Sequence, residues 1–286
     1  MNTIEIFENG KTAFIPSSWS ECTKKQSRQL FRLWYKCTRK GKSPLEFSVR
    51  ALWLLLGVRK SFRGAFKPAA PKQGENVYLL CERLLGFLSK DDSAAVCYDS
   101  IFNPLPWARA FILPLNGPSD FLCDLTFGEF RHACAALEAF LANGKQEDLD
   151  ECFACMYRLP FPIANAAGRM VPGMGSDIRV HKFIASAVPQ WQKILSVQWL
   201  AACLDRLQKE TVSIDGEDVE LERLFSSDSG KVGGVKLGWT DLLFEAAKDG
   251  AFGGVSGVDS APLYSILLMM WHNFKENKIY ERSIRT

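Results

Sequence analysis

Residues 23–56, TKKQSRQLFRLWYKCTRKGKSPLEFSVRALWLLL, set the expected fold class because they predict two consecutive helices. The first helix begins at the capping box Thr23–Gln26, in which threonine and a glutamine three positions later satisfy each other's backbone N–H groups. The second begins at Ser43-Pro44-Leu45-Glu46, with serine at the N-cap, proline at the first helical position and glutamate at the third. We expect helices over residues 24–38 and 44–56, joined by a short turn into an αα-hairpin.

The same kinds of signal predict helices through most of the remaining chain. Thr126-Phe127-Gly128-Glu129 is a second capping box, and Gly144 is typical of the end of the helix that follows. The further predicted helices cover residues 77–89, 127–143, 147–157, 177–187, 189–209, 240–248 and 262–280. Residues 64–76 are predicted to form a loop. The four prolines of residues 94–124 favour irregular or extended chain, with a small strand or two.

Two other patterns set the limits of the predicted domains. Thr3–Glu8 and Lys11–Ile15 alternate apolar and polar residues around Asn9-Gly10, which is typical of a β-hairpin with a type I′ turn. A Ser/Gly-rich stretch, residues 226–234, indicates a flexible linker. The sequence therefore predicts a mainly α protein: a multi-helix, bundle-like body with a short N-terminal β-hairpin and a small C-terminal helical unit. The body covers residues 1–225, the linker 226–237, and the C-terminal unit 238–286, whose two helices are joined by a glycine-rich connection over 250–257.

The composition is typical of a globular protein without a membrane span. Of 286 residues, 47% are hydrophobic and 23% are charged, which is enough apolar surface for a core. The most apolar run, Ala51–Val58, is far shorter than the roughly 20 residues that a membrane helix needs. The N-terminus lacks the basic and apolar regions of a secretory signal. The nine cysteines are odd in number and scattered, so we expect reduced thiols and a cytoplasmic location.

The net charge of +3 conceals a strong asymmetry along the chain. Residues 24–72 contain fourteen Lys or Arg and one acid, Glu46, and so carry a charge of +13. Residues 1–23 carry −2, so the remainder must carry −8. A basic segment beside an acidic body indicates either a negatively charged partner or the packing of the two regions against each other.

The basic segment supplies most of the candidate partner-binding residues. They are Lys24, Lys25, Arg28, Arg32, Lys36, Arg59, Lys60 and Arg63, to which Trp239 and Phe252 of the C-terminal unit are added. One interpretation is contact with nucleic acid or with an acidic protein. The other is a solvated basic face, because the interleaved aromatic residues fit the apolar faces of two amphipathic helices. No helix-turn-helix or RNA-binding signature accompanies the charge, so nucleic acid is not the favoured partner.

Catalytic motifs are weak in this sequence. Cys152 and Cys155 form a C-x-x-C pair, which with His132 and Cys134 is a weak candidate for a zinc or redox site. The spacing of His132 and Cys134 is poor for a metal, and the pair falls in an apolar helical pattern that favours two buried thiols. The sequence contains no P-loop, nucleophile-elbow or dinucleotide-binding pattern. We therefore expect no enzymatic activity, no cofactor and no metal.

Three stretches in this order resemble a family of proteins. They are residues 15–23 (IPSSWSECT), residues 126–130 (TFGEF) followed by 154–158 (ACMYR), and residues 238–253 (GWTDLLFEAAKDGAFG) with the amphipathic helix after them. They resemble uncharacterised prophage proteins of the tail-assembly region, which look like tail assembly chaperones. This sequence departs from the family at Cys22 and Cys155, where aliphatic residues are expected.

The resemblance implies a non-enzymatic role in phage morphogenesis in the cytoplasm of the host cell. The implied function is a tail assembly chaperone that binds apolar helical segments of a tape measure protein before the tail polymerises. The alternatives are a virion structural protein, such as a tail or connector subunit, and a nucleic-acid-binding protein that uses residues 24–72. A metal or redox enzyme that uses Cys152 and Cys155 ranks last.

Overall fold

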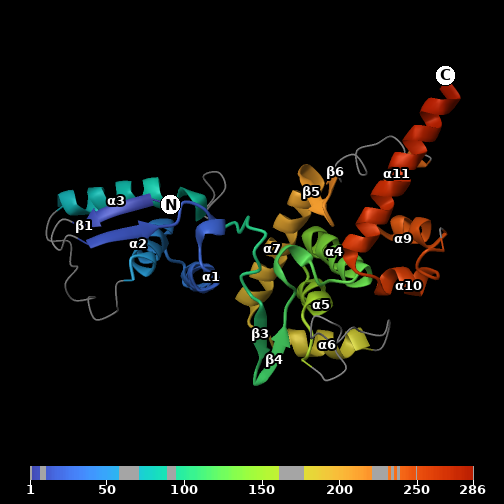
Figure 1. Cartoon of the computed structure of the whole chain (residues 1–286). Coiled ribbons are helices and arrows are strands. Elements are labelled where there is room, and N and C mark those ends of the chain that lie inside the picture. Colours follow the sequence, from blue (N-terminus) through green and yellow to red (C-terminus); the bar gives the residue numbers. More distant parts are fainter. Residues whose placement is uncertain are drawn as a thin grey trace. The chain divides into compact units, whose positions relative to one another are not determined.

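The computed structural model is mainly α-helical, as the sequence predicts (Figure 1). The structure describes residues 2–6, 11–57, 71–88, 95–160, 177–220, 231–232, 235–236, 239–248 and 250–285. The chain divides into two compact units. Unit 1 comprises residues 1–105 and 190–199, and unit 2 comprises residues 106–189 and 200–286. Within the described ranges, none of the helices combines the length and the hydrophobicity that crossing a bilayer requires.

Unit 1 begins with an antiparallel pair of strands, β1 (Asn2–Ile6) and β2 (Lys11–Ile15). Their register pairs Ile6 with Lys11 at the closed end. This confirms the predicted N-terminal hairpin, whereas its predicted Asn9-Gly10 turn lies outside the described residues. Two short 3-10 turns also belong to unit 1: η1 (Trp19–Glu21) and η3 (Gly86–Leu88).

Helices α1 (Lys24–Arg39) and α2 (Pro44–Leu55) confirm the predicted αα-hairpin. The Thr23 hydroxyl accepts a hydrogen bond of 3.2 Å from the backbone N–H of Gln26, and the Gln26 side chain accepts one of 2.9 Å from the backbone N–H of Thr23. The Ser43 hydroxyl caps α2 by accepting from the third helical N–H at 3.2 Å. Both helices therefore begin where their local capping signals place them.

Helix α3 (Pro71–Leu85) begins six residues before the predicted start, so the prediction of a loop up to residue 76 is wrong. Pro71 takes the first helical position, where its missing N–H would have no intrahelical partner in any case. Gly74 lies inside the helix, which costs helix stability but does not break it. The earlier part of the predicted loop, up to residue 70, lies outside the described residues.

The core of unit 1 forms around Trp19, which is buried. Its ring centroid lies 5.6 Å from that of Phe87 and 5.1 Å from that of Tyr98. Helix α7 (Gln190–Lys209), predicted over 189–209, contributes its first ten residues to this unit. The Gln198 side chain accepts a hydrogen bond of 2.9 Å from the backbone N–H of Tyr98. This bond connects α7 to the chain that follows η3.

Unit 2 contains the remaining elements, and its strands form separate two-stranded antiparallel sheets. In chain order they are β3 (Trp107–Ala110), β4 (Leu113–Asn116), η4 (Asp120–Leu122), α4 (Phe127–Asn143), α5 (Gln146–Met156), α6 (Asp177–Ser186), the second half of α7, β5 (Thr211–Ile214), β6 (Glu217–Glu220), β7 (Lys231–Val232), β8 (Val235–Lys236), α9 (Trp239–Lys248), α10 (Val255–Ser260) and α11 (Leu263–Arg285). Helices α4, α5, α6, α9 and α11 confirm predicted helices. The short helix α10 was not predicted; it begins near the end of the glycine-rich connection, at Val255, and continues beyond it to Ser260.

Helix α4 forms the centre of unit 2, because α5, α10 and α11 all contact it. Phe127 and Phe130 of α4 are completely buried. The chain before α4 also pairs with the chain before α11: the backbone N–H of Phe127 donates to the Ala261 carbonyl, and the N–H of Leu263 donates to the Leu125 carbonyl, both at 2.9 Å. The N-terminus of α4 and the last three helices are thus parts of one core.

The compact units consequently divide the chain differently from the predicted domains. The predicted C-terminal unit, residues 238–286, packs on α4 within unit 2, and the division from unit 1 falls at residue 105 and within α7. The Ser/Gly-rich pattern indicates a linker but carries no information on which helices pack together afterwards. Of the predicted linker, only β7 and β8 lie in the described part of the chain.

Candidate partner-binding surfaces

The β3–β4 hairpin belongs to unit 2 (Figure 1). Its loop carries two exposed apolar side chains. Ala110 pairs with Leu113, so the loop between the strands consists only of Phe111 and Ile112. Phe111 is 85% exposed and Ile112 is 90% exposed. Side chains that remain in water contribute no hydrophobic stabilisation, so folding does not account for these two residues.

Phe111 is also held in a strained backbone conformation, with a φ angle of 55°. A two-residue hairpin loop with a positive φ at its first residue corresponds to a type II′ turn, where glycine is strongly preferred. A residue with a Cβ atom costs roughly 1–2 kcal/mol in the left-handed region. Phenylalanine at this position therefore makes the hairpin less stable than glycine would.

The other non-glycine residues with positive φ in the described part of the chain each have a local explanation. Asp215 begins an Asp-Gly turn between β5 and β6, and this residue pair is favoured in type I′ hairpin turns. Leu122 is completely buried, so core packing offsets its strain. The Phe121 carbonyl accepts a hydrogen bond of 2.7 Å from the Tyr264 hydroxyl. Of these four described residues, Phe111 alone combines a positive φ with an exposed apolar side chain, a combination that points to a role outside the folding of the chain.

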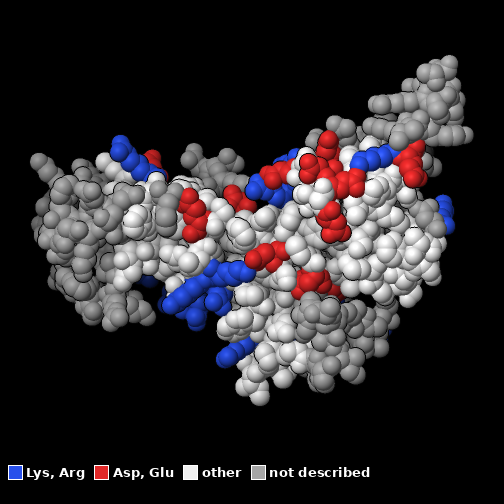
Figure 2. All heavy atoms as spheres, viewed as in Figure 1, with Lys and Arg blue, Asp and Glu red and all other residues white. Residues whose placement is uncertain are grey.

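Four further apolar side chains are exposed on the hairpin and on α6, which contacts β3. Trp107 and Leu113 are about half exposed, and on α6 Val180 is 57% and Phe183 80% exposed. We call these residues the apolar tip: Trp107, Phe111, Ile112, Leu113, Val180 and Phe183. Together they expose on the order of 800 Å², about what one partner contributes to a standard protein interface. In Figure 2 the end of the hairpin carries no charged residue on the visible face.

Arg109 of β3 lies beside Trp107 of the apolar tip. Strand β3 alternates, with Ala108 and Ala110 buried and Trp107 and Arg109 directed outward. The Arg109 guanidinium lies 5.4 Å from the centroid of the Trp107 ring. Tryptophan and arginine are the residue types that most often dominate binding energy at protein interfaces. The outward face of β3 thus has the chemistry of a contact surface.

The base of the hairpin is fixed to the core of unit 2. Asn116 donates to the Arg158 carbonyl at 2.7 Å and accepts from the Arg158 backbone N–H at 2.9 Å. The Arg158 side chain is buried and forms an ion pair of 3.4 Å with Glu129, which is also buried. Removing one partner of a buried ion pair is strongly destabilising, because the other charge remains in the interior. The apolar tip is therefore presented on a firm support.

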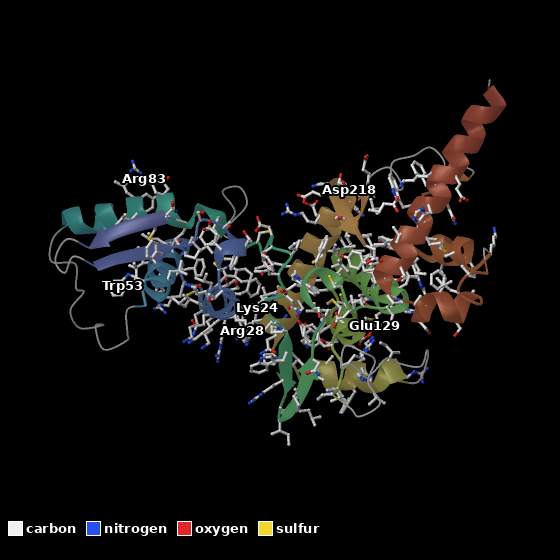
Figure 3. All side chains as sticks on the ribbon, in the orientation of Figure 1. Lys24, Arg28, Trp53, Arg83, Glu129 and Asp218 are labelled. Carbon is white, nitrogen blue, oxygen red and sulfur yellow. The ribbon has the colours of Figure 1, made fainter. Side chains whose placement is uncertain are left out.

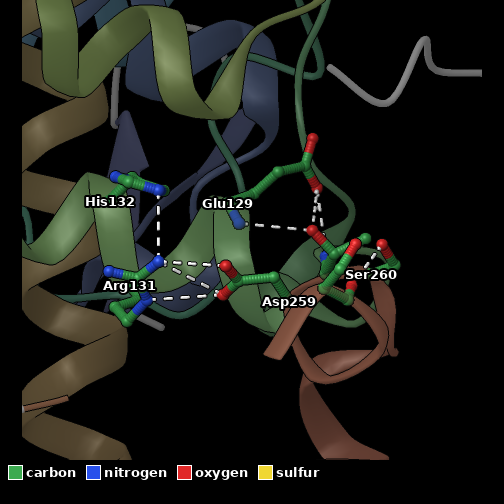
Figure 4. A network of polar contacts seen from close by, with 7 residues as sticks. Glu129, Arg131, His132, Asp259 and Ser260 are labelled. Atoms are coloured by element: carbon green, nitrogen blue, oxygen red, sulfur yellow. Dashed lines mark hydrogen bonds and ion pairs between the residues drawn. The ribbon is translucent and has the colours of Figure 1, made fainter. Parts of the chain in front are cut away.

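A second polar network holds α10 against α4 (Figure 4). The Arg131 guanidinium lies 3.1 Å from the Asp259 carboxylate, and Glu129 closes the capping box by accepting from the Thr126 backbone N–H at 3.0 Å. A Cβ atom at Gly128 would lie 2.8 Å from the Asp259 carbonyl oxygen, so only glycine permits this close approach. Glu129 takes part both in the capping box of α4 and in the ion pair with Arg158, and so links the start of α4 to the base of the hairpin.

The thiols proposed as a weak metal or redox site lie in the core. Cys134, Cys152 and Cys155 are buried, and all nine cysteines of the chain are free thiols. Burial raises the pKa of Cys155 to about 12 and the pKa of Cys152 well above its ordinary value. Such thiols stay protonated at neutral pH, whereas nucleophiles and metal ligands are thiolates. His132 lies 3.2 Å from the Arg131 guanidinium, and among the described residues no group of three or more potential ligands is suited to a metal ion.

The predicted basic residues fall into two groups. Lys24, Lys25, Arg28, Arg32 and Lys36 lie on α1, where Arg28 is half-buried and the other four are exposed. Lys24 and Arg28 are labelled in Figure 3, and their side chains leave α1 on the same side. The second group, Arg59, Lys60 and Arg63, lies outside the described residues.

The two aromatic candidates of the C-terminal region are half-buried. The ring of Trp239 meets that of Phe130 edge to face at 4.6 Å, so it helps to attach α9 to α4. Phe252 lies where the chain approaches itself closely: a Cβ atom at Gly257 would be 1.6 Å from the Phe252 carbonyl oxygen. Both residues have structural contacts within unit 2.

The apolar tip was not predicted from the sequence. The stretch Phe111-Ile112-Leu113 contains no glycine or asparagine, so it gives no signal for a two-residue turn. On α6, Val180 and Phe183 lie three residues apart on the side opposite the buried His181 and Ala185. Apolar residues on two faces of one helix are a signal that could have indicated this surface.

No protein-family model, curated protein or solved structure matches this chain. Its class therefore follows from its own geometry. It is a mainly α protein of two compact units, with an exposed apolar tip on unit 2 and a basic helix face on unit 1.

Proposed function

We propose that this protein is a non-enzymatic interaction protein that uses the apolar tip to bind an apolar helical segment of a partner protein. The observation that carries the proposal is Phe111, which is 85% exposed and strained at a φ of 55°. Both properties lower the stability of the isolated protein, and both are explained when a partner covers the ring.

The chemistry of the surface favours an apolar helix as the occupant. Six exposed apolar side chains lie on the hairpin and on α6, and the Arg109 guanidinium lies against one of them, Trp107. A helix with an apolar stripe covers such side chains through residues at positions i, i+3, i+4 and i+7. Its C-terminal end carries a partial negative charge, which the Arg109 guanidinium complements.

The partner is, on this proposal, a phage tail protein in the cytoplasm of the host cell. The resemblance of residues 15–23, 126–130, 154–158 and 238–253 to tail-assembly proteins supports a tail assembly chaperone, with the tape measure protein as its helical partner. An obligate interface, as in a virion subunit, buries about 2,000–5,000 Å² in total, whereas the apolar tip and its partner together would bury about 1,600 Å². The smaller area supports a transient chaperone over a permanent tail or connector subunit.

Co-expression with the tape measure protein of the same phage, followed by affinity purification of the complex, tests the proposal. The double variant F111G/I112N replaces the two loop residues with types that favour a tight turn. We expect it to fold and to lower the affinity at least about 30-fold, because hot-spot residues contribute about 2 kcal/mol or more each. The matched control is Leu141→Asn, another exposed apolar residue of unit 2, which should leave binding unchanged.

Two results would contradict the proposal. The first is a stable complex with the tape measure protein whose affinity is the same in F111G/I112N and in the wild type. The second is the absence of any complex on co-expression. Stoichiometric presence of the protein in purified virions would instead favour the structural subunit.

A further inference from the structure

Helix α1 of unit 1 carries six basic residues and no acid. They are Lys24, Lys25, Arg28, Arg32, Lys36 and Arg39. A helix turns by about 100° per residue and rises by about 1.5 Å, so the six lie within an arc of about 120° over about 22 Å. The only other α1 residue in that arc is Tyr35. We call this surface the basic face of α1, and in Figure 2 it forms one blue patch over α1 with no red inside it.

The basic face reduces the stability of the helix that carries it. Lys24, Arg28, Arg32 and Lys36 follow one another at i,i+4 spacing, and each such like-charge pair costs about 0.2–0.5 kcal/mol. The two lysines in the first turn also oppose the positive end of the helix dipole. Glu46, the only acid between residues 24 and 57, lies in α2 and forms ion pairs outside α1: it lies 3.2 Å from Lys42, which precedes α2, and it also contacts Arg50. Intrahelical pairing therefore does not account for the charge of α1.

Aromatic rings position two of the arginines. The Arg32 guanidinium lies 5.9 Å from the ring centroid of Trp191, and that of Arg39 lies 6.0 Å from the ring of Tyr35. The Tyr35 hydroxyl donates a hydrogen bond of 2.6 Å to the Gln190 side chain, which fixes its ring. A guanidinium that stacks on a ring presents its N–H donors at its edge, in a fork that matches two phosphate oxygens.

We propose that the basic face of α1 binds the phosphate backbone of nucleic acid. An amphipathic helix binds a membrane through its apolar face, but Leu30 and Phe31 of α1 are completely buried in unit 1. The centre of a protein interface is depleted of charge, whereas this arc contains six cations and one tyrosine. Each strand of duplex DNA carries one negative charge per about 3.4 Å of axis, so six cations over about 22 Å match the charge density of one strand.

Fluorescence anisotropy of the full chain with a labelled random-sequence duplex of about 20 base pairs tests this, because each phosphate contact contributes about −0.9 to the slope of log affinity against log salt. Four to six contacts predict a slope of about −4 to −5, so raising NaCl from about 50 to 200 mM should lower the affinity on the order of 10²- to 10³-fold. The variant K24Q/R28Q/R32Q/K36Q should lose most of both the affinity and the slope. The variant should remain folded, because the removal of like-charge repulsion offsets the lost contact between Arg32 and Trp191.

The matched control is K145Q/R179Q/K209Q/K248Q, which removes the same number of charges from exposed positions of unit 2. It should bind DNA like the wild type. Equal loss in both variants would mean that net charge alone attracts DNA, and this would overturn the proposal.

Two competitors separate the nucleic acid from other polyanions. Poly-L-glutamate, supplied at the same charge concentration as unlabelled duplex, should displace the probe much less well. Vesicles that contain anionic lipid should not sediment the protein. Equal competition by poly-L-glutamate, or vesicle binding without DNA binding, would assign the face to an acidic protein or a membrane and so contradict the proposal.

Discussion

The basic face of α1 and the apolar tip of unit 2 both retain residues that reduce the stability of the protein, but they do so through different forces. On α1 the cost is repulsion between like charges, which acts over several ångströms and is screened by salt. At the apolar tip the cost is the strained backbone of Phe111 and the exposure of apolar surface, which salt does not screen. One partner with one kind of chemistry would not account for both surfaces.

The comparison indicates that each unit has its own partner. On our two proposals, unit 1 binds a polyanion and unit 2 binds an apolar helix. A protein of this kind can bring a nucleic acid and a helical protein together, and its two affinities respond oppositely to ionic strength.

The largest expected effect comes from the ion pair that supports the hairpin. Arg158→Met leaves the buried Glu129 carboxylate without its cation, which should destabilise unit 2 by about 3–5 kcal/mol. Hydrogen exchange measured by mass spectrometry should show faster exchange in β3, β4 and α4, with α1 unchanged. The double variant E129Q/R158M removes both charges and should restore much of the protection. Loss of protection in α1 as well would show that the units are not independent.

A smaller effect of opposite sign is expected at the tip itself. Phe111→Gly should stabilise unit 2 by about 0.5–1 kcal/mol, because relief of the positive-φ strain exceeds the added entropy of the unfolded chain. Leu122→Gly is the matched control: its φ is 62°, but its side chain is completely buried, so glycine should destabilise there by loss of core packing. Urea unfolding of both variants checks the difference. Destabilisation by Phe111→Gly would mean that the ring stabilises the isolated protein, against our account.

The smallest expected effect concerns the buried thiols. Burial raises the pKa of Cys155 to about 12, so at pH 8 roughly one molecule in 10⁴ carries the thiolate. Cys152 and Cys155 should therefore resist iodoacetamide in the native protein and react in urea, while the half-exposed Cys97 reacts in both. Peptide mass spectrometry reads each site. Rapid native labelling of Cys152, or bound zinc, would give unit 2 a chemical role and weaken the comparison of two surfaces.

Local signals in the sequence predicted the helices whose N-termini carry capping residues. The capping boxes at Thr23 and Thr126 and the serine cap at Ser43 each depend on residues within four positions of one another, so a single sequence contains the whole interaction. Helix α10 and the boundary between the units were not predictable in this way. They depend on pairs such as Arg131 with Asp259 and Phe127 with Ala261, which lie far apart in the chain.

The two candidate surfaces also differ in how far the sequence alone predicts them. The basic face of α1 is readable from charge and helical spacing, and five of its six residues were candidates from the sequence alone. Only the structure pairs Arg32 with the ring of Trp191. The apolar tip was missed because its turn lacks glycine. Burial decides which apolar residues of β3, β4 and α6 stay in water, and burial is a property of the folded chain.

One measurement tests the central claim most directly: the affinities of wild type, K24Q/R28Q/R32Q/K36Q and F111G/I112N for duplex DNA and for the tape measure protein, each at low and high salt. The account predicts a crossed result. The α1 variant should lose salt-sensitive DNA binding and keep the protein partner, whereas the tip variant should lose the protein partner and keep DNA. If each variant weakened both interactions equally, or if neither variant weakened either one, the assignment of two separate surfaces would be contradicted.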